Sequence, residues 1–236
     1  KATAEQTVEF LDGVHALGDN LRESLKSLQT GLELRKPDRG YDIEAHNLAR
    51  LATEPECVHD FGALLEEWCH ETEAYLDESD RGRFESQDAG PDTELEYWRR
   101  RMQRLSGIVE QLKGRECKAV IGVLTAVTKQ QEDLGLDRAR AFALLRRWKQ
   151  IDMNITEAAN EARDNVKYLA TLERFIEPLY TETPGAILDT LPALVNAIKM
   201  IHTIARYYNT TERMTKLFSK ITNQMVNNCK RNVNGT

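Results

Sequence analysis

The feature that most constrains the fold is a run of apolar residues at helical spacing between residues 137 and 178. No glycine or proline interrupts it before Pro178. The apolar positions recur every three or four residues, which places them on one side of an α-helix. They are Ala141, Leu145, Trp148, Ile151, Ile155, Ala158, Ala162, Val166, Leu169, Leu172 and Ile176. At about 1.5 Å per residue such a helix would be on the order of 60 Å long, so the segment predicts a spine for a stack of helices.

The remaining sequence also predicts α-helices, each with an apolar stripe bounded by polar or glycine-containing segments. Thr93 and Glu96 have the spacing of a capping box, so a helix is expected to begin there and to end at Gly114. Further helices are expected at 117–133, 191–208 and 210–230. No segment alternates apolar and polar positions with the β-branched residues that strands favour. The sequence therefore predicts an all-α protein of stacked antiparallel helix bundles with one long spine helix.

Capping residues and prolines predict where the chain turns after the spine. Thr183 precedes Pro184 and Thr190 precedes Pro192, and a helix tolerates proline best in its first turn. Asn209 is expected to cap the last helix. The final helices are expected to pack back on the spine through Ile198, Ile201, Leu217, Ile221 and Met225. The polar side of the spine is then left for a partner subunit, at Asn160, Glu161 and Asp164.

Charge divides the chain into two parts. Residues 1–90 hold 9 Lys and Arg against 21 Asp and Glu, a net of −12, and residues 91–236 hold 23 against 17, a net of +6. The polar segment 78–91 ends in Gly-Pro and is typical of a linker. We therefore expect an acidic helical subdomain at 1–77, a linker at 78–91 and a helical bundle at 92–236. The acidic charge indicates either solvated surfaces or a docking contact for a basic partner.

Two seams with coiled-coil spacing lie in the acidic part. The first consists of Leu11, Val14, Gly18, Leu21, Leu25, Leu28 and Leu32. The second consists of Val58, Phe61, Leu65, Trp68, Thr72 and Tyr75. Two such seams most simply pack on each other as an antiparallel pair. The alternative is an exposed seam that awaits a partner helix.

The sequence predicts no catalytic, cofactor or metal site. It lacks a glycine-rich phosphate loop, a His-Glu-x-x-His zinc motif and a nucleophile elbow. The strongest metal candidates are Cys57, His59, Cys69 and His70, but residues adjacent or two apart on a helix point in different directions. We therefore expect core cysteines and surface histidines. The scattered cysteines fit a reducing compartment, and a chain that starts at Lys1 without a signal-peptide pattern is expected to be a piece of a longer protein.

Basic side chains gather at 99–104 and 138–149, and residues 91–150 hold 13 basic against 8 acidic groups, a net of +5. This excess is modest for nucleic-acid binding, where many neutralised phosphates supply the affinity. A solvated face or an acidic protein partner is therefore favoured, and nucleic acid is not expected. No membrane association is expected either, because no apolar run approaches the roughly 20 residues that a span requires.

Several unusual segments follow one another in a fixed order. They are GPDTELEYWRRRMQRLSGIVEQL at 90–112, LLRRWKQIDMNITEAANEARDNV at 144–166, DNVKYLATLERFIEPL at 164–179, LPALVNAIKMIHTIARYYNTTERMT at 191–215 and LFSKITNQM at 217–225. In this order they resemble the N-terminal tail of an axonemal dynein heavy chain. The segment LLEEWCHETEAYLDESD at 64–80 is similar to outer-arm gamma-type chains.

This resemblance implies a non-catalytic tail in the axoneme of a cilium or flagellum, in the cytoplasm, with the ATP-hydrolysing motor ring far downstream. It implies anchoring to the doublet microtubule through outer-arm docking proteins. Dynein intermediate and light chains and other heavy chains are the further partners that it implies. The residues alone leave an alternative, a free-standing helical adaptor of the cytoskeleton, although no spectrin-like repeat is visible.

Overall fold

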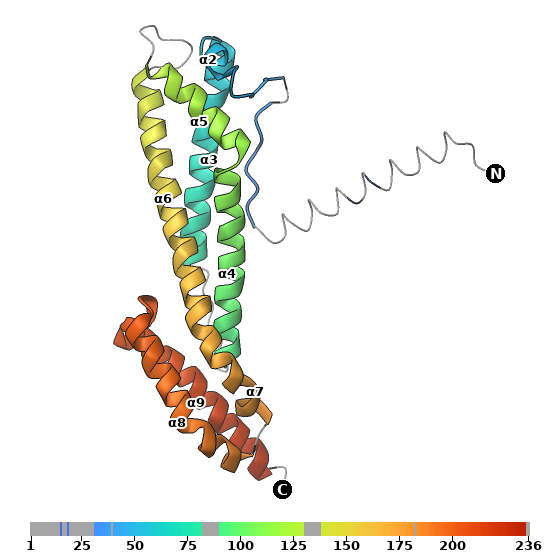
Figure 1. Cartoon of the computed structure of the whole chain (residues 1–236), viewed down its shortest axis with the longest axis vertical. Helices are drawn as coiled ribbons and strands as arrows, with labels where there is room; N and C mark the ends of the chain where they lie inside the picture. The colour runs from blue at the N-terminus through green and yellow to red at the C-terminus, as the bar shows by residue number, and fades with distance from the viewer. Residues whose placement is uncertain are drawn as a thin grey trace, which may run out of the picture. The chain divides into compact units, whose positions relative to one another are not determined.

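The computed structural model describes residues 31–38, 40–81, 90–129, 138–181 and 183–234, together with His15 and Gly18. Within these ranges the chain forms helices joined by turns, without a β-strand (Figure 1). The predicted all-α class is therefore confirmed. Nearly all of the predicted seam at 11–32, and with it the proposed pairing of two seams, lies outside the described residues.

Two compact units account for the contacts of the chain. The first comprises residues 1–77 and 103–155, and the second comprises residues 78–102 and 156–236. This grouping differs from the sequence-based division at residues 78–91, because helices α4 (Pro91–Leu112) and α6 (Arg138–Leu169) each contribute residues to both units. Helix α3 (Pro55–Arg81) also continues into the expected linker. Whether residues 1–77 and 92–236 fold independently stays a prediction.

The first unit is built around α3, whose apolar seam is buried as its spacing predicts. Val58, Phe61, Leu65 and Trp68 are each at most 1% exposed. The indole ring of Trp68 lies 5.8 Å from that of Trp148 on α6, measured between ring centroids, and its Nε1 donates a 2.8 Å hydrogen bond to the carbonyl oxygen of Arg35. Within the described residues, the seam therefore packs against α6 and the segment that precedes the short helix α2 (Leu48–Leu51).

Helices α3 and α6 run in the same direction in the first unit, and α4 runs in the opposite one (Figure 1). Two ion pairs show the parallel register, because Glu66 meets Arg140 and Glu73 meets Arg147, seven residues further along both helices. Helix α5 (Arg115–Val127) crosses the end of this group and packs on α2. Of the four side chains that its spacing predicts to face inward, Val120, Leu124 and Val127 are buried, whereas Ile121 is only half-buried.

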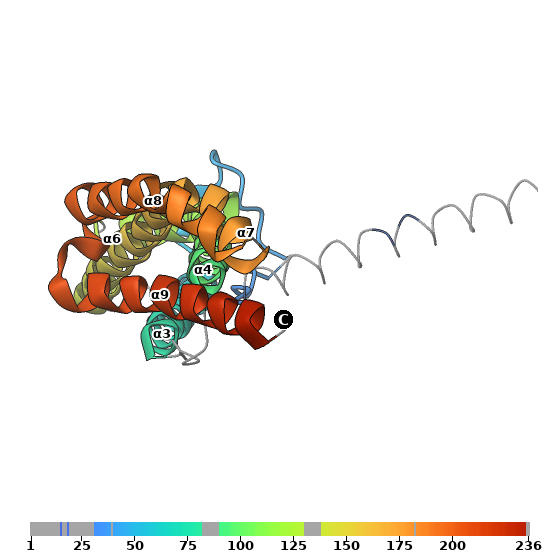
Figure 2. The same cartoon turned by 90° about the horizontal axis from the view of Figure 1, so that it is seen from below.

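The second unit contains α7 (Glu173–Thr181), α8 (Pro184–Ile204) and α9 (Thr211–Asn234). Helices α8 and α9 run in opposite directions and are joined by a turn (Figure 2). That turn includes the 3₁₀ helix η2 (Tyr207–Asn209). Helix α7 contacts both of them. The side chains expected to face inward are buried at Ile198, Ile201, Leu217 and Ile221 and half-buried at Met225.

The predicted spine helix ends earlier than its apolar spacing suggests. Helix α6 stops at Leu169, and the 3₁₀ helix η1 (Ala170–Leu172) separates it from α7. The hydroxyl of Thr171 donates to the carbonyl oxygen of Tyr168 at 2.7 Å, a local bond of the kind that competes with regular helical bonding. The spacing of apolar residues did not predict this break, because a single 3₁₀ turn shifts the apolar stripe without ending it.

Two prolines disrupt the helices less than predicted. Pro178 lies inside α7, and Pro192 lies inside α8 instead of starting a helix. A proline frees the carbonyl four residues earlier from its helical bond. Those residues are Arg174 and Leu188, and both are exposed. Water can therefore donate a hydrogen bond to each freed carbonyl.

Of four predicted caps in the described residues, one is confirmed. Thr190 does not cap a helix, because it lies inside α8 and its hydroxyl donates to the Ile187 carbonyl oxygen. The Thr183 hydroxyl accepts a 3.4 Å hydrogen bond from the Ala186 N–H at the start of α8. The capping box is wrong, because α4 begins at Pro91 and the Thr93 hydroxyl donates to the Gly90 carbonyl. The Asn209 cap is also wrong, because Asn209 belongs to η2 and the residue directly before α9 is Thr210.

Helix α8 corrects the expectation that no apolar segment approaches the length of a membrane span. It has 21 residues, and its most apolar 18-residue window has a mean hydropathy of 1.2 and is 28% buried. Length and composition alone would allow such a helix to cross a membrane. One side of α8 nevertheless lies in the core of the second unit, through Leu194, Ile198 and Ile201, as in a helix of a soluble bundle.

Candidate functional site

The candidate metal ligands do not come together. Cys57 and Cys69 are buried in the core side of α3, whereas His59 and His70 are exposed on other sides of the same helix. No group of three or more metal-binding side chains occurs among the residues that the structure describes. The absence of a metal site in this chain remains an expectation.

Burial also makes the core thiols poor nucleophiles. It raises the pKa of Cys57 to about 12, that of Cys69 to about 11 and that of Cys117 to about 12. The thiolate is the reactive form of cysteine. Cys229 on α9 differs from them because it is half-buried.

We therefore expect native protein to react with Ellman's reagent first at Cys229. The other three thiols should react at a rate limited by unfolding, and all should react at once in denaturant. A Cys229→Ser variant should lose the fast phase and keep the slow one. Fast labelling of Cys57 or Cys69 in that variant would contradict their placement in the core.

Many residues of the predicted basic cluster are engaged within their own unit. In the second unit, Arg99 pairs with Glu173 at 2.9 Å. In the first, Arg140 pairs with Glu66 at 2.7 Å and Arg147 pairs with Glu73 at 2.5 Å. Acidic α3 and basic α6 are therefore complementary in charge. Part of the basic charge that could have bound an external partner is neutralised within the chain.

The Glu73–Arg147 pair makes a pH-dependent contribution to stability. The hydrogen bond from Arg147 lowers the pKa of Glu73 below its usual value of 4.5. A carboxyl whose pKa is depressed by folding stabilises the fold at neutral pH, and this contribution is lost as the pH falls through the folded-state pKa. The Arg147 side chain is 39% exposed and that of Glu73 is 44% exposed. The pair therefore contributes at most about 1 kcal/mol to the free energy of unfolding.

Glu73→Gln should therefore lower the melting temperature slightly at pH 7. The difference from the parent chain should shrink as the pH falls below about 4.5 and disappear under more acidic conditions. Glu161→Gln, at an exposed position on α6, is the matched control and should change little at either pH. A difference that stayed constant with pH would show that ionisation of Glu73 is not its source.

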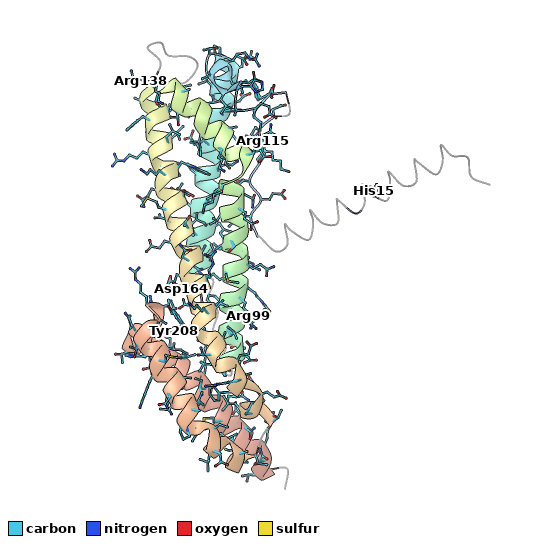
Figure 3. All side chains as sticks on the ribbon, in the orientation of Figure 1. His15, Arg99, Arg115, Arg138, Asp164 and Tyr208 are labelled. Atoms are coloured by element: carbon cyan, nitrogen blue, oxygen red, sulfur yellow. The ribbon has the colours of Figure 1, made fainter. Side chains whose placement is uncertain are left out.

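A buried carboxylate organises the second unit. Glu94 is 2% exposed and accepts a 2.6 Å hydrogen bond from the ammonium group of Lys220 on α9. It also accepts hydrogen bonds from the Tyr208 hydroxyl and, at 3.3 Å, from the Trp98 Nε1–H. The same indole N–H lies 2.7 Å from the Tyr208 oxygen, and Figure 3 labels Tyr208 beside α8 and α9.

Sequence reasoning missed this cluster, which joins helices α4 and α9. Glu94 reads as a solvated residue of a helix start, and its partner Lys220 is 126 residues away. The available signal was its position four residues before Trp98, which places the two side chains on the same side of the helix. The Glu94 carboxylate is paired with Lys220 and accepts hydrogen bonds from Tyr208 and Trp98, so the cluster stabilises the second unit by holding α4 against α9.

Exposed apolar side chains concentrate on the last two helices. Among the described residues, nine large hydrophobic side chains are exposed, and seven of them lie on α8 and α9. They are Leu188, Val195, Met200, Ile204, Phe218, Val226 and Val233. Exposed apolar side chains mark interaction sites in soluble proteins where they form a contiguous patch. The residues predicted on the polar side of the spine, Asn160, Glu161 and Asp164, are also exposed.

Comparison with known proteins gives these surfaces a context. Residues 58–236 match the family model for the dynein heavy chain, N-terminal region 1. The chain is 39% identical, over 99% of its length, to the dynein gamma chain of the flagellar outer arm of Chlamydomonas reinhardtii. It is 38% identical, over 97% of its length, to dynein axonemal heavy chain 5 of Rattus norvegicus. A further relative is the dynein-1-alpha heavy chain of the flagellar inner arm I1 complex of C. reinhardtii, at 31% identity over 92% of the chain.

The fold and its surfaces define an all-helical segment without a catalytic constellation among the described residues. The chain belongs to the dynein heavy chain family and corresponds to its N-terminal region. The resemblance inferred from the sequence is thereby confirmed. The chain spans 5% of the C. reinhardtii gamma chain, 6% of the rat heavy chain 5 and 4% of the inner-arm relative.

Proposed function

We propose that this chain is a non-catalytic tail segment of an axonemal dynein heavy chain, of the outer-arm gamma type. It would anchor an ATP-driven microtubule motor to the ciliary or flagellar doublet microtubule, without binding ATP or another cofactor itself. The relatives that support this assignment are named as axonemal and flagellar heavy chains, and the gamma chain has higher identity than the inner-arm relative. Anchoring would pass through docking proteins on the doublet.

The observation that carries a docking role is the set of exposed apolar side chains on α8 and α9. A monomeric segment gains nothing from Leu188 at 64% exposure or Phe218 at 49%, whereas an interface would bury them. Intermediate chains, light chains and neighbouring heavy chains are the partners that we propose for this surface. Family membership favours this role over a free-standing adaptor, because the relatives are roughly twenty times longer than the chain, which covers 5% of the gamma chain.

Sedimentation with axonemes tests the proposal. Purified chain should bind saturably to axonemes from which the outer arms have been extracted with salt, and more weakly to intact axonemes whose sites are occupied. Leu188→Gln together with Phe218→Gln should reduce this binding by about tenfold, which corresponds to roughly 1.4 kcal/mol. The matched control changes two exposed polar residues of the same helices, Asn196→Gln and Asn223→Gln, and should bind as the parent does.

Bare microtubules polymerised from tubulin provide the second arm of this experiment. Equal binding to bare microtubules and to extracted axonemes would overturn anchoring through docking proteins. Equal binding by the apolar variant and its control would overturn the role of α8 and α9.

A further inference from the structure

The part of α6 that belongs to the first unit carries two stripes on opposite sides. The inner stripe is buried and consists of Ala141, Leu144, Trp148, Ile151 and Ile155. The outer stripe consists of Phe142, Arg146, Lys149 and Met153, spaced by four, three and four residues. At about 3.6 residues per turn, this spacing aligns the outer four along one side of the helix, roughly half a turn from the inner stripe.

The outer stripe is exposed along its whole length. Phe142 is 64% exposed and Met153 is 54% exposed, and Arg146 and Lys149 between them are exposed as well. Arg138, labelled in Figure 3, marks the end of α6 from which the stripe begins. An apolar side chain therefore stands at each end of the stripe, with two cations in the middle.

The cations of the outer stripe differ from their neighbours. Arg140 and Arg147, on the flank of α6, are bound to carboxylates of α3. Neither Arg146 nor Lys149 forms an ion pair with any residue that the structure describes, and the stripe itself contains no carboxylate. The fold thus uses some cations of α6 internally and leaves these two facing solvent.

We propose that the outer stripe of α6 docks an acidic amphipathic α-helix of a partner protein. The spacing of four, three and four residues is that of a coiled-coil seam, which another helix matches along its length. Apolar residues of the partner would cover Phe142 and Met153, and carboxylates would meet Arg146 and Lys149. The inference deepens the proposed function, on which it rests in taking the chain to be a docking segment.

Charge and dimensions favour a helix over other acidic surfaces. The stripe is about 17 Å long, or about three helical turns, which suits a narrow partner. Two unpaired cations are few for a nucleic acid, whose affinity comes from many neutralised phosphates. They are also few for an anionic membrane, where each basic residue contributes only about 1 kcal/mol. Large apolar side chains at both ends supply the remaining contact in a helix pair.

A designed peptide tests the inference with the whole chain. The probe is a fluorescent helix of about three heptads, with leucines placed to meet Phe142 and Met153 and glutamates placed to meet Arg146 and Lys149. Fluorescence anisotropy should show saturable binding that weakens as salt is raised. A peptide with lysine in place of each glutamate should not bind.

Variants of the stripe locate the binding. Arg146→Glu with Lys149→Glu should weaken binding by tenfold or more, about one decade in Kd. Phe142→Ser with Met153→Ser should do the same without changing the charge. The matched control is Lys113→Glu with Lys118→Glu, which changes net charge equally at exposed positions of the same unit, and it should bind within about twofold of the parent.

Three outcomes would overturn the inference once circular dichroism has shown that the variants are folded. One is an equal loss of binding in the stripe variant and the lysine control, which would indicate unspecific charge. Another is equal binding of the lysine-containing peptide. The third is binding to phosphatidylserine vesicles with the same dependence on the stripe, which would assign it to a lipid surface. Because the test uses no axonemal material, its failure is distinguishable from a failure of the sedimentation experiment.

Discussion

Glu94→Ala is expected to destabilise the second unit by about 3–5 kcal/mol, because it removes the carboxylate from a buried ammonium group. The Lys220 side chain is 12% exposed in the folded chain, so water cannot replace the lost carboxylate fully. A loss of this size is a large fraction of the roughly 5–15 kcal/mol that stabilises a typical domain. Urea denaturation followed by circular dichroism measures it.

Two further variants make the Glu94 result specific. Glu94→Leu combined with Lys220→Met removes both charges and should recover most of the lost stability. Glu96→Ala breaks the ion pair between Glu96 and Arg100 on the same helix. Both side chains of that pair are exposed, so the substitution should lower the free energy of unfolding by at most about 1 kcal/mol. If Glu94→Ala cost no more than Glu96→Ala, the buried cluster would not be the organising contact of the second unit.

Trp68→Ala is expected to have a comparable effect on the first unit, a loss of about 3–5 kcal/mol. The side chain is 1% exposed and fills the contact with Trp148. Its removal leaves a cavity and leaves the carbonyl of Arg35 without the indole donor. The melting temperature of the chain should therefore fall strongly.

Phe142→Ala is the matched control for Trp68→Ala, because it truncates another large aromatic side chain of the same unit at a position that is 64% exposed. It should leave the melting temperature nearly unchanged. Equal melting of the two variants would contradict the placement of Trp68 in the core.

Helices could be predicted from the sequence wherever a narrow apolar stripe recurs, as on α3 and α6. Local spacing identified Val58, Phe61, Trp68 and Trp148 correctly as buried. It was wrong by one position at Leu145 and Ala158, which are half-buried while their neighbours Leu144 and Ala159 are buried. Helix ends were less predictable, because they depend on single hydrogen bonds. At the start of α4, the Thr93 hydroxyl bonds to the Gly90 carbonyl instead of forming the expected cap.

Non-local contacts could not be predicted from one sequence. Nothing near Glu94 in the chain indicates that Lys220 will neutralise it, and nothing near Arg147 indicates Glu73. The outer stripe of α6 became recognisable only after the ion pairs of its neighbours were known, because in the sequence all arginines of 138–149 look alike. The family, in contrast, was accessible from the order of whole segments.

The discontinuous units have a consequence for the order in which the chain is made. Residues 78–102 of the second unit leave the ribosome before residues 103–155, which belong to the first. Lys220, the partner of Glu94, is synthesised 126 residues later. At typical rates of translation this delay is on the order of 10 s. During that interval Trp98 lacks Tyr207 and Tyr208, which contact its indole ring in the finished unit. The second unit is therefore complete only after α9 has been synthesised.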